Sequence, residues 1–232
     1  DQHDEHYQTK YVQSHHGKPA DDRNKRKEYA RDEYDDSINY EKNKGLVVAH
    51  SFRGSEEAAS RVTKKMNSEG FEWTCLTENE KESCLNIITS IHPNKEYFEN
   101  KYFLGYDDHG TPQGWPNVLN YNEIPKLKQT FAIGDACSTN DFEFAKSKLF
   151  GIWILRKGGI GYIGSSGVSW YNDILEDNIN KKYVDFVTDS LIEKETIGEI
   201  YSKLEEKSDT FKSDYLLYGD PTFEVGLEKW KK

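Results

Sequence analysis

The chain has 232 residues, which is room for one globular domain of moderate size plus extensions, and its 41 acidic and 31 basic residues give a formal net charge of −10. Nucleic acid is a poor partner for such a surface, because binding phosphates depends on clustered Lys and Arg. No run of about 18 uncharged apolar residues occurs, so the sequence predicts no membrane-spanning helix. A basic-then-apolar signal peptide is missing and the first residue is Asp, so we expect a processed or excised chain.

Polar and charged residues dominate the first 44 positions, and most of the core must come from the residues beyond them. We therefore predict a polar N-terminal extension over residues 1–44, with a surface helix between Ala20 and Lys44, and a globular domain over residues 45–232. Residues 1–17 are rich in His. Such a pattern could bind metal, but it is more often a solvated tail.

From Gly45 onward, apolar runs alternate with amphipathic stretches. The runs predict strands over 46–49, 71–76, 101–106, 130–137, 160–166 and 214–220. The stretches predict helices over 56–68, 80–91, 142–157 and 172–207, the first of which follows the N-cap candidate Ser55. This alternation indicates an α/β fold with a mostly parallel sheet of about six strands and helices on both faces. The strands expected to be neighbours are 46–49, 102–106, 131–135 and 160–164.

The chain contains three cysteines, Cys75, Cys84 and Cys137. An odd number without C-x-x-C spacing argues against a disulfide framework and against a thiolate zinc site. One pair could still close, which would leave the odd thiol as the residue of interest. We expect Cys75 and Cys84 to be core residues.

Two reactive side chains follow predicted strands at the sheet edge where ligands and catalytic groups collect. His109 comes just after one strand, and Cys137 ends the next. A nearby imidazole can convert a thiol to the nucleophilic thiolate, so the two residues are candidates for a catalytic pair. Gly110 allows a tight turn that can aim its N–H, with that of Cys137, at the oxygen of a tetrahedral intermediate. The alternative is an ordinary buried cysteine beside a loop histidine.

Four ordered motifs carry a resemblance to a known family. They are YDDHG (106–110), AIGDACSTNDFEF (132–144), GGIGYIGSS (158–166) followed by SWYND (169–173), and LYGDPTFEV (217–225). In these motifs the chain resembles the gingipain family of cysteine peptidases over nearly the whole globular part. The resemblance implies that residues 45–232 are a catalytic domain with a caspase-like three-layer sandwich. It also implies a cysteine endopeptidase that acts on a peptide or protein substrate through an acyl-enzyme.

Carried over onto the matching positions, the resemblance makes His109 the catalytic histidine and Cys137 the nucleophile. The backbone amides of Gly110 and Cys137 then supply the oxyanion hole. In family members of lysine specificity, a Trp walls the primary pocket and an acid three residues later meets the substrate ammonium. Trp170 and Asp173 have that spacing, which implies cleavage after a basic residue, Lys or Arg.

The assignment of the specificity acid depends on a one-residue gap in the match. Without the gap, Tyr171 and Ile174 take the places of Trp170 and Asp173, and such a pocket would favour an apolar residue. Asp173 could also serve only to cap the helix that follows it. The sequence leaves these alternatives open.

One position departs from the family pattern. Gingipains orient the histidine with an acid just after the first strand of this subdomain, where residues 51–53 of this chain are Ser, Phe and Arg. Glu56 or Glu57 could reach the histidine instead, or a backbone carbonyl could serve. We expect Asp107 and Asp108 to be solvated or strand-end turn residues rather than orienting groups.

Two other functions fit the same motifs. A sortase-like transpeptidase would pass the acyl group to an amine rather than to water, and a catalytically silent domain would only bind a peptide in the cleft. The resemblance implies no required cofactor. Calcium is a family trait, yet no EF-hand loop is present and the sequence assigns no ligands. By the same resemblance we expect a secreted or cell-surface protein, while the oligomeric state stays open.

Overall fold

The computed structural model describes seven stretches of the chain. They are residues 42–50, 54–82, 84–86, 95–145, 148–168, 179–207 and 214–227. The predicted N-terminal extension and its surface helix lie outside these residues, except for the last three positions of the extension.

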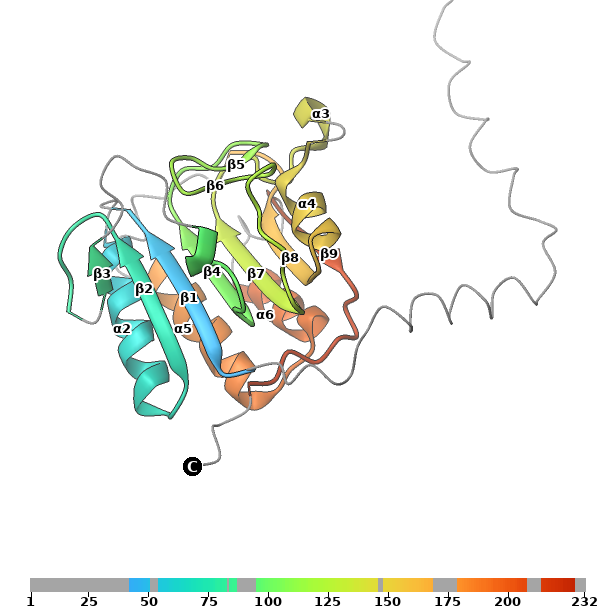
Figure 1. The fold of residues 1–232 in the computed structure, drawn as a ribbon. Helices are drawn as coiled ribbons and strands as arrows, with labels where there is room; N and C mark the ends of the chain where they lie inside the picture. The colour runs from blue at the N-terminus through green and yellow to red at the C-terminus, as the bar shows by residue number, and fades with distance from the viewer. Residues whose placement is uncertain are drawn as a thin grey trace, which may run out of the picture. The chain divides into compact units, whose positions relative to one another are not determined.

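In the described part of the chain, seven strands form one sheet in the order β3-β2-β1-β4-β7-β8-β9 (Figure 1). Their bounds are β1 (Lys44–Ala49), β2 (Glu72–Thr77), β3 (Cys84–Asn86), β4 (Phe103–Asp107), β7 (Thr130–Asp135), β8 (Gly159–Ser165) and β9 (Tyr215–Gly219). All neighbouring strands pair in parallel except β8 and β9, which are antiparallel. The four strands predicted to be neighbours are β1, β4, β7 and β8, so the prediction of a mostly parallel sheet is confirmed.

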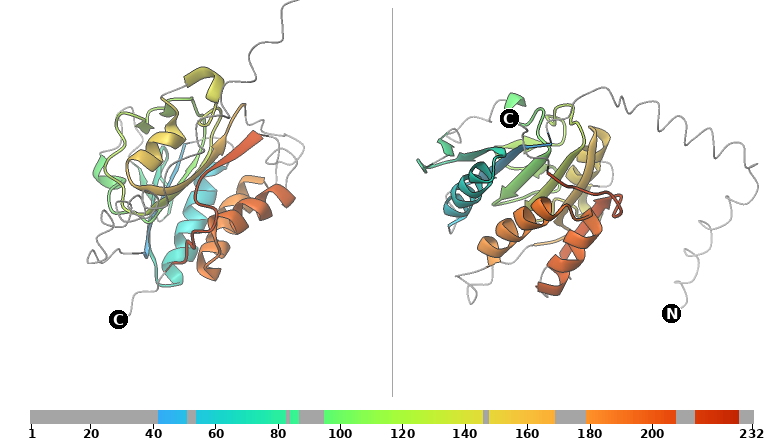
Figure 2. Two further views of the ribbon diagram at one scale, coloured as in Figure 1. Left: turned by 90° about the vertical axis from the view of Figure 1, so that its right-hand side faces the viewer. Right: turned by 90° about the horizontal axis from the view of Figure 1, so that it is seen from below.

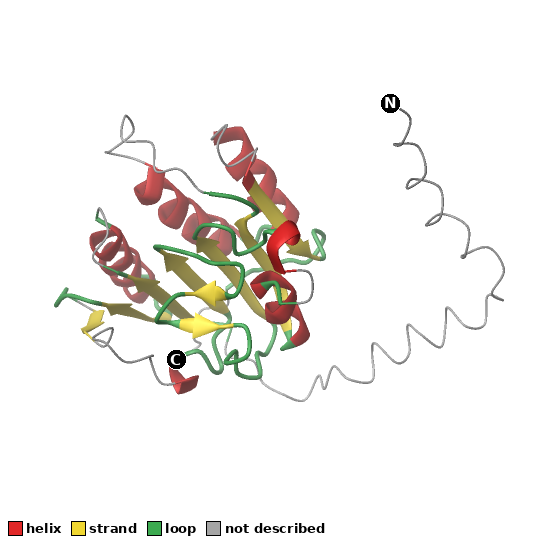
Figure 3. Cartoon of the chain, turned by 90° about the horizontal axis from the view of Figure 1, so that it is seen from above, coloured by secondary structure: helices red, strands yellow, loops and turns green. Residues whose placement is uncertain are grey.

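Helices cover both faces of this sheet. One face carries α2 (Ser55–Ser68), α5 (Ile179–Glu193) and α6 (Ile197–Lys207) (Figure 2). The other carries α4 (Phe150–Arg156) and a small antiparallel hairpin of β5 (Gly114–Trp115) and β6 (Leu119–Asn120) (Figure 3). Two further short elements are η1 (Lys95–Tyr97) and α3 (Phe142–Ala145). The three layers agree with the expected caspase-like sandwich.

The central strands β1, β4, β7 and β8 bury both of their faces, which is why their sequences are mostly apolar runs. In β1, Val47 and Ala49 pack toward α2, α5 and α6, whereas Leu46 and Val48 pack toward the α4 side. Of the helices in the described residues, none combines the length and apolar character that crossing a membrane requires.

The segment predicted as a helix over 80–91 contains an edge strand instead. Cys84–Asn86 forms β3, which pairs in parallel with β2. Cys75 and Cys84 are partners in this pairing, with Cα atoms 4.6 Å apart, and they form a disulfide. Cys75 is a core residue as predicted, and Cys137 keeps its thiol. The disulfide and the pairing with β2 favour a strand here over the helix that the spacing of apolar residues predicted.

The predicted helices differ from the structure in three other respects. The predicted helix over 142–157 is two helices, α3 and α4, and the helical stretch over 172–207 contains α5 and α6. Lys194, with a left-handed φ of 61°, follows the last residue of α5 and ends that helix. Ser55 is the first residue of α2 rather than its N-cap, because Gly54, with φ of 87°, holds the N-cap position.

Candidate active site

The register between β4 and β7 brings the two predicted catalytic residues to one level of the sheet edge. The last paired residues of these parallel strands are Asp107 and Asp135. The N–H of Asp108 continues the ladder by donating to the Asp135 carbonyl at 3.2 Å. His109 and Cys137 each lie two residues beyond that last pair. The carboxyl ends of the strands therefore present the imidazole and the thiol from adjacent loops.

The backbone of Gly110 packs directly against the backbone of Cys137. A Cβ atom at Gly110 would lie 2.7 Å from the Cys137 nitrogen and closer still to its carbonyl oxygen. Only glycine fits such an approach, because the atoms in the way belong to the backbone. The sequence predicted this glycine as a partner of Cys137, and the structure brings the two residues together.

The loop that carries Cys137 is held by the strands beside it. Asn140 is fully buried, and its side-chain amide donates to the carbonyls of Gly164 at 3.0 Å and Leu216 at 3.2 Å. The N–H of Ser138, a residue with φ of 57°, donates to the Gly167 carbonyl at 2.7 Å. These hydrogen bonds connect the loop that carries Cys137 to β8, to β9 and to Gly167.

A second buried contact supports the same loop. The Tyr162 hydroxyl donates to Thr139 Oγ1 at 2.9 Å, and both residues are fully buried. Burial raises the pKa of Tyr162, so its hydroxyl stays a donor. Sequence reasoning missed Thr139 and Asn140 as supporting residues. The sequence feature that could have identified them is the polar run STND immediately after Cys137. Polar residues that become buried need hydrogen-bond partners.

His109 combines a fixed backbone with an accessible side chain. Its carbonyl accepts a hydrogen bond from the Tyr106 hydroxyl at 2.8 Å, and its N–H donates to Asp108 Oδ1 at 2.5 Å. The imidazole itself is 74% exposed, so it can reach a bound substrate. Burial, together with the charges of Asp108 and Asp107, raises the pKa of Tyr106. The Tyr106 hydroxyl is therefore a neutral donor.

Asp107 and Asp108 lie at the end of β4, as one predicted alternative had it, whereas the other alternative, that they are solvated, is wrong. The Asp108 side chain is 8% exposed, and its oxygens lie 3.9 Å from His109 Nε2 and 3.7 Å from His50 Nδ1. Asp107 is buried. The sheet ends at these residues, but the loops and helices around it cover them.

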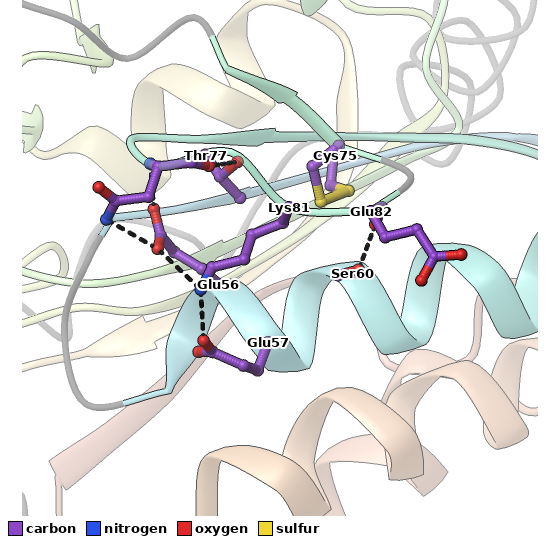
Figure 4. A network of polar contacts seen from close by, with 9 residues as sticks. Glu56, Glu57, Ser60, Cys75, Thr77, Lys81 and Glu82 are labelled. Carbon is purple, nitrogen blue, oxygen red and sulfur yellow. Dashed lines mark hydrogen bonds and ion pairs between the residues drawn. A yellow bond between two sulfur atoms is a disulfide. The ribbon is translucent and has the colours of Figure 1, made fainter.

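The two glutamates considered as orienting groups are engaged elsewhere. Glu56 is buried and accepts hydrogen bonds from the backbone and side-chain nitrogens of Asn79, at 2.7 and 3.0 Å. Glu57 forms an ion pair with Lys81, and Lys81 also lies 3.7 Å from Glu56 (Figure 4). The hydrogen bond from Lys81 lowers the pKa of Glu57. These contacts tie the start of α2 to the loop after β2, and they do not support an orienting role.

Asp107 and Asp135 form a buried carboxyl pair beneath the catalytic loops. They are register partners, so their side chains leave the sheet on the same face. Loss of hydration raises the pKa of both, and the charge of Asp135 raises that of Asp107 further. The Tyr215 hydroxyl donates to Asp135, which partly offsets the increase. One Asp107 oxygen, Oδ2, has no hydrogen-bond partner within the described part of the chain.

The predicted substrate-binding residues fall in a segment outside the described residues. This applies to Trp170 and Asp173 and to their alternatives Tyr171 and Ile174. Residues 51–53, where the family carries its orienting acid, are also outside. Within the described ranges, no group of three or more His, Cys, Asp or Glu side chains could hold a metal ion.

A three-layer α/β sandwich with a histidine and a thiol on adjacent strand ends defines a class, the thiol hydrolases of caspase-like fold. The family model described as Peptidase family C25, the gingipain family, matches residues 3–226. The chain belongs to this family of cysteine peptidases, which act on proteins as hydrolases. No curated protein and no solved structure matches the chain.

Gly110→Ala should disable the site. The new methyl group meets the Cys137 backbone, so the two loops must separate, and peptidase activity should fall about 100-fold or more because displacements of 1 Å have such effects. Gly167→Ala is the matched control, since a Cβ at Gly167 meets no atom of the described residues within 4 Å. Hydrolysis of a peptide substrate by both variants measures this, and equal activity of the two would contradict the close approach.

Asp107→Asn should change how stability depends on pH. Because the folded-state pKa values of Asp107 and Asp135 are raised, their contribution is fully present below the unfolded pKa of about 4 and is lost as pH rises through the folded values. The wild-type free energy of unfolding should fall by up to about 1.4 kcal/mol per pH unit per proton in that window. The free energy of unfolding of the variant should fall less steeply with pH. At neutral pH the variant should therefore be more stable, relative to the wild type, than it is at acidic pH.

Urea unfolding at a series of pH values measures this difference. Asp220→Asn is the control, because hydrogen bonds from Thr222 lower the pKa of Asp220 and it should show no such gain. A loss of stability in Asp107→Asn that is the same at every pH would mean that the two carboxyls do not repel each other.

Proposed function

We propose that the chain is a cysteine endopeptidase that uses a His109–Cys137 dyad. The observation that carries this proposal is the contact of the Gly110 and Cys137 backbones beyond the last paired residues of β4 and β7. It supports a geometry in which the imidazole and the thiol share one site.

The reaction follows from the roles of these groups. His109 takes the proton of the Cys137 thiol, and the thiolate attacks the scissile carbonyl to form a C–S bond. The backbone N–H groups of Gly110 and Cys137 stabilise the oxyanion of the tetrahedral intermediate. When the C–N bond breaks, His109 gives its proton to the leaving amine. Water then attacks the acyl-enzyme, with His109 as base, and releases the acid and the thiol.

A basic residue is the proposed primary specificity, with Asp173 as the partner of the substrate cation and Trp170 as the wall of its pocket. A buried ammonium or guanidinium needs a carboxylate, because it loses several kcal/mol of solvation without one. The aromatic face of Trp170 would pack on the Lys stem or the Arg plane. The net charge of −10 favours the approach of a cationic substrate. The Cys75–Cys84 disulfide is typical of oxidising compartments and supports a secreted or cell-surface setting.

Labelling by a peptidyl chloromethyl ketone tests the dyad. The wild-type protein should be alkylated at Cys137 and should hydrolyse a peptide with a basic residue before the cleaved bond. His109→Ala should abolish labelling, and Cys137→Ala should abolish turnover while leaving the melting temperature nearly unchanged. Absence of labelling under reducing conditions, with and without calcium, would identify a silent peptide-binding domain. Transfer of the acyl group to an added amine in preference to water would identify a transpeptidase.

Asp173→Asn tests the specificity acid. If its carboxylate partners the substrate cation, activity should fall selectively on Lys and Arg substrates, by roughly 2–5 kcal/mol in transition-state binding, and not on a Leu substrate. Rates on the three substrates measure this. Equal loss on all three would mean that Asp173 only supports the fold, and no loss would place the specificity acid elsewhere.

A further inference from the structure

The group that orients the catalytic histidine is the one role that the family pattern leaves without an occupant. We propose that Asp108 is the positioning residue of His109 and that His50 holds the Asp108 carboxylate in place. The inference rests on the proposed role of His109 as the catalytic base, and it gives the orienting function to Asp108, which the sequence analysis set aside, with His50 in support.

Asp108 is built into the sheet edge next to His109. Its N–H is fixed by the Asp135 carbonyl at 3.2 Å, and its side chain is only 8% exposed. Its Oδ1 accepts from the His109 N–H at 2.5 Å and lies 3.9 Å from His109 Nε2. At this place the carboxylate can orient the ring and face the charge that His109 gains when it takes the Cys137 proton. Such contacts are often long in unliganded sites and tighten when substrate binds.

His50 reaches Asp108 from the neighbouring strand. β1 pairs with β4 up to Ala49 and Asp107, so His50 and Asp108 are the next residues on each side. The His50 side chain is 15% exposed, and its Nδ1 lies 3.7 Å from Asp108 Oδ2. The two oxygens of Asp108 therefore face two different histidines.

Tyr106 completes the frame around these residues. Its ring meets that of His50 edge to face, with centroids 6.4 Å apart and an interplanar angle of 79°. Its hydroxyl donates to the His109 carbonyl at 2.8 Å. Tyr106 thus fixes the His109 backbone while Asp108 acts on its imidazole.

The surroundings of His50 indicate how its ring is oriented toward Asp108. Its Nε2 is buried and finds no hydrogen-bond partner among the residues that the structure describes. Burying a lone pair there costs less than burying an unpaired N–H, which favours the tautomer with its proton on Nδ1, toward Asp108. The other titratable groups next to this frame are Tyr106, which stays a neutral hydroxyl, and the carboxyl pair of Asp107 and Asp135.

The test measures the rate at which iodoacetamide alkylates Cys137 in the full chain, from acidic to alkaline pH. The variants are Asp108→Asn and, as matched control, Glu56→Gln, which also replaces a buried carboxylate by its amide. In Asp108→Asn the imidazolium loses its partner, so less thiolate is present at neutral pH. The alkylation rate there should fall about tenfold, and the midpoint of its pH profile should move to higher pH. Glu56→Gln should match the wild type.

A second variant tests the role of His50. It also keeps the proposal testable if Asp108→Asn does not fold. His50→Phe keeps an aromatic ring against Tyr106 and removes Nδ1, so it should shift the midpoint in the same direction by a smaller amount. Combined with Asp108→Asn, it should add no further shift, because the two residues act as one unit. If Asp108→Asn does not fold, the shift in His50→Phe decides the question alone.

Three results would overturn the proposal. They are a midpoint in a folded Asp108→Asn protein equal to that of the wild type, a shift in Glu56→Gln as large as that in Asp108→Asn, and an unchanged midpoint in His50→Phe. Alkylation needs no peptide substrate. A wild-type protein that cleaves no peptide would therefore contradict the proposed function, while the shifts in alkylation would still establish the positioning role.

Discussion

The register between β4 and β7 is the constraint on which the site depends. Because Asp107 and Asp135 are the last paired residues, the positions two residues further on reach the sheet edge at the same level, and these are His109 and Cys137. A slip of one residue would turn each side chain to the opposite face. The same register is unfavourable in one respect. It places two carboxyl groups side by side where they are buried, which disfavours their charged forms. The register of these parallel strands is maintained because helices and loops pack on both faces of the sheet.

The two loops that leave these strands are restrained in different ways. The loop that carries Cys137 is anchored through buried polar side chains. Among these, Asn140 connects it to both β8 and β9. The histidine loop is restrained through Tyr106 and Asp108, and its imidazole stays exposed. A restrained thiol beside an accessible imidazole would suit the proposed covalent catalysis, because the thiol must hold its place while the base serves first the thiol and then the leaving amine.

Much of the fold could be predicted from the sequence, because strands buried on both faces appear as apolar runs, and the motifs around His109 and Cys137 fall at their ends. β3 could not, because Cys84–Asn86 is a short edge strand whose pairing and disulfide depend on Cys75 in another element. The burial of Asp107 and Asp108 was missed for a similar reason. Residues beside a strand end look solvated in sequence, whereas their contacts with Asp135 and His50 arise only when distant strands pair.

The central claim is that strand register forms a thiol–imidazole dyad, and the most direct test is the distance between the His109 imidazole and Cys137 Sγ in a crystal structure of the free protein. The account predicts a separation of about 3–6 Å, because hydrogen bonds in unliganded sites are often long. A separation beyond roughly 10 Å, with the loops of both residues well ordered, is outside the reach of proton transfer and would contradict it.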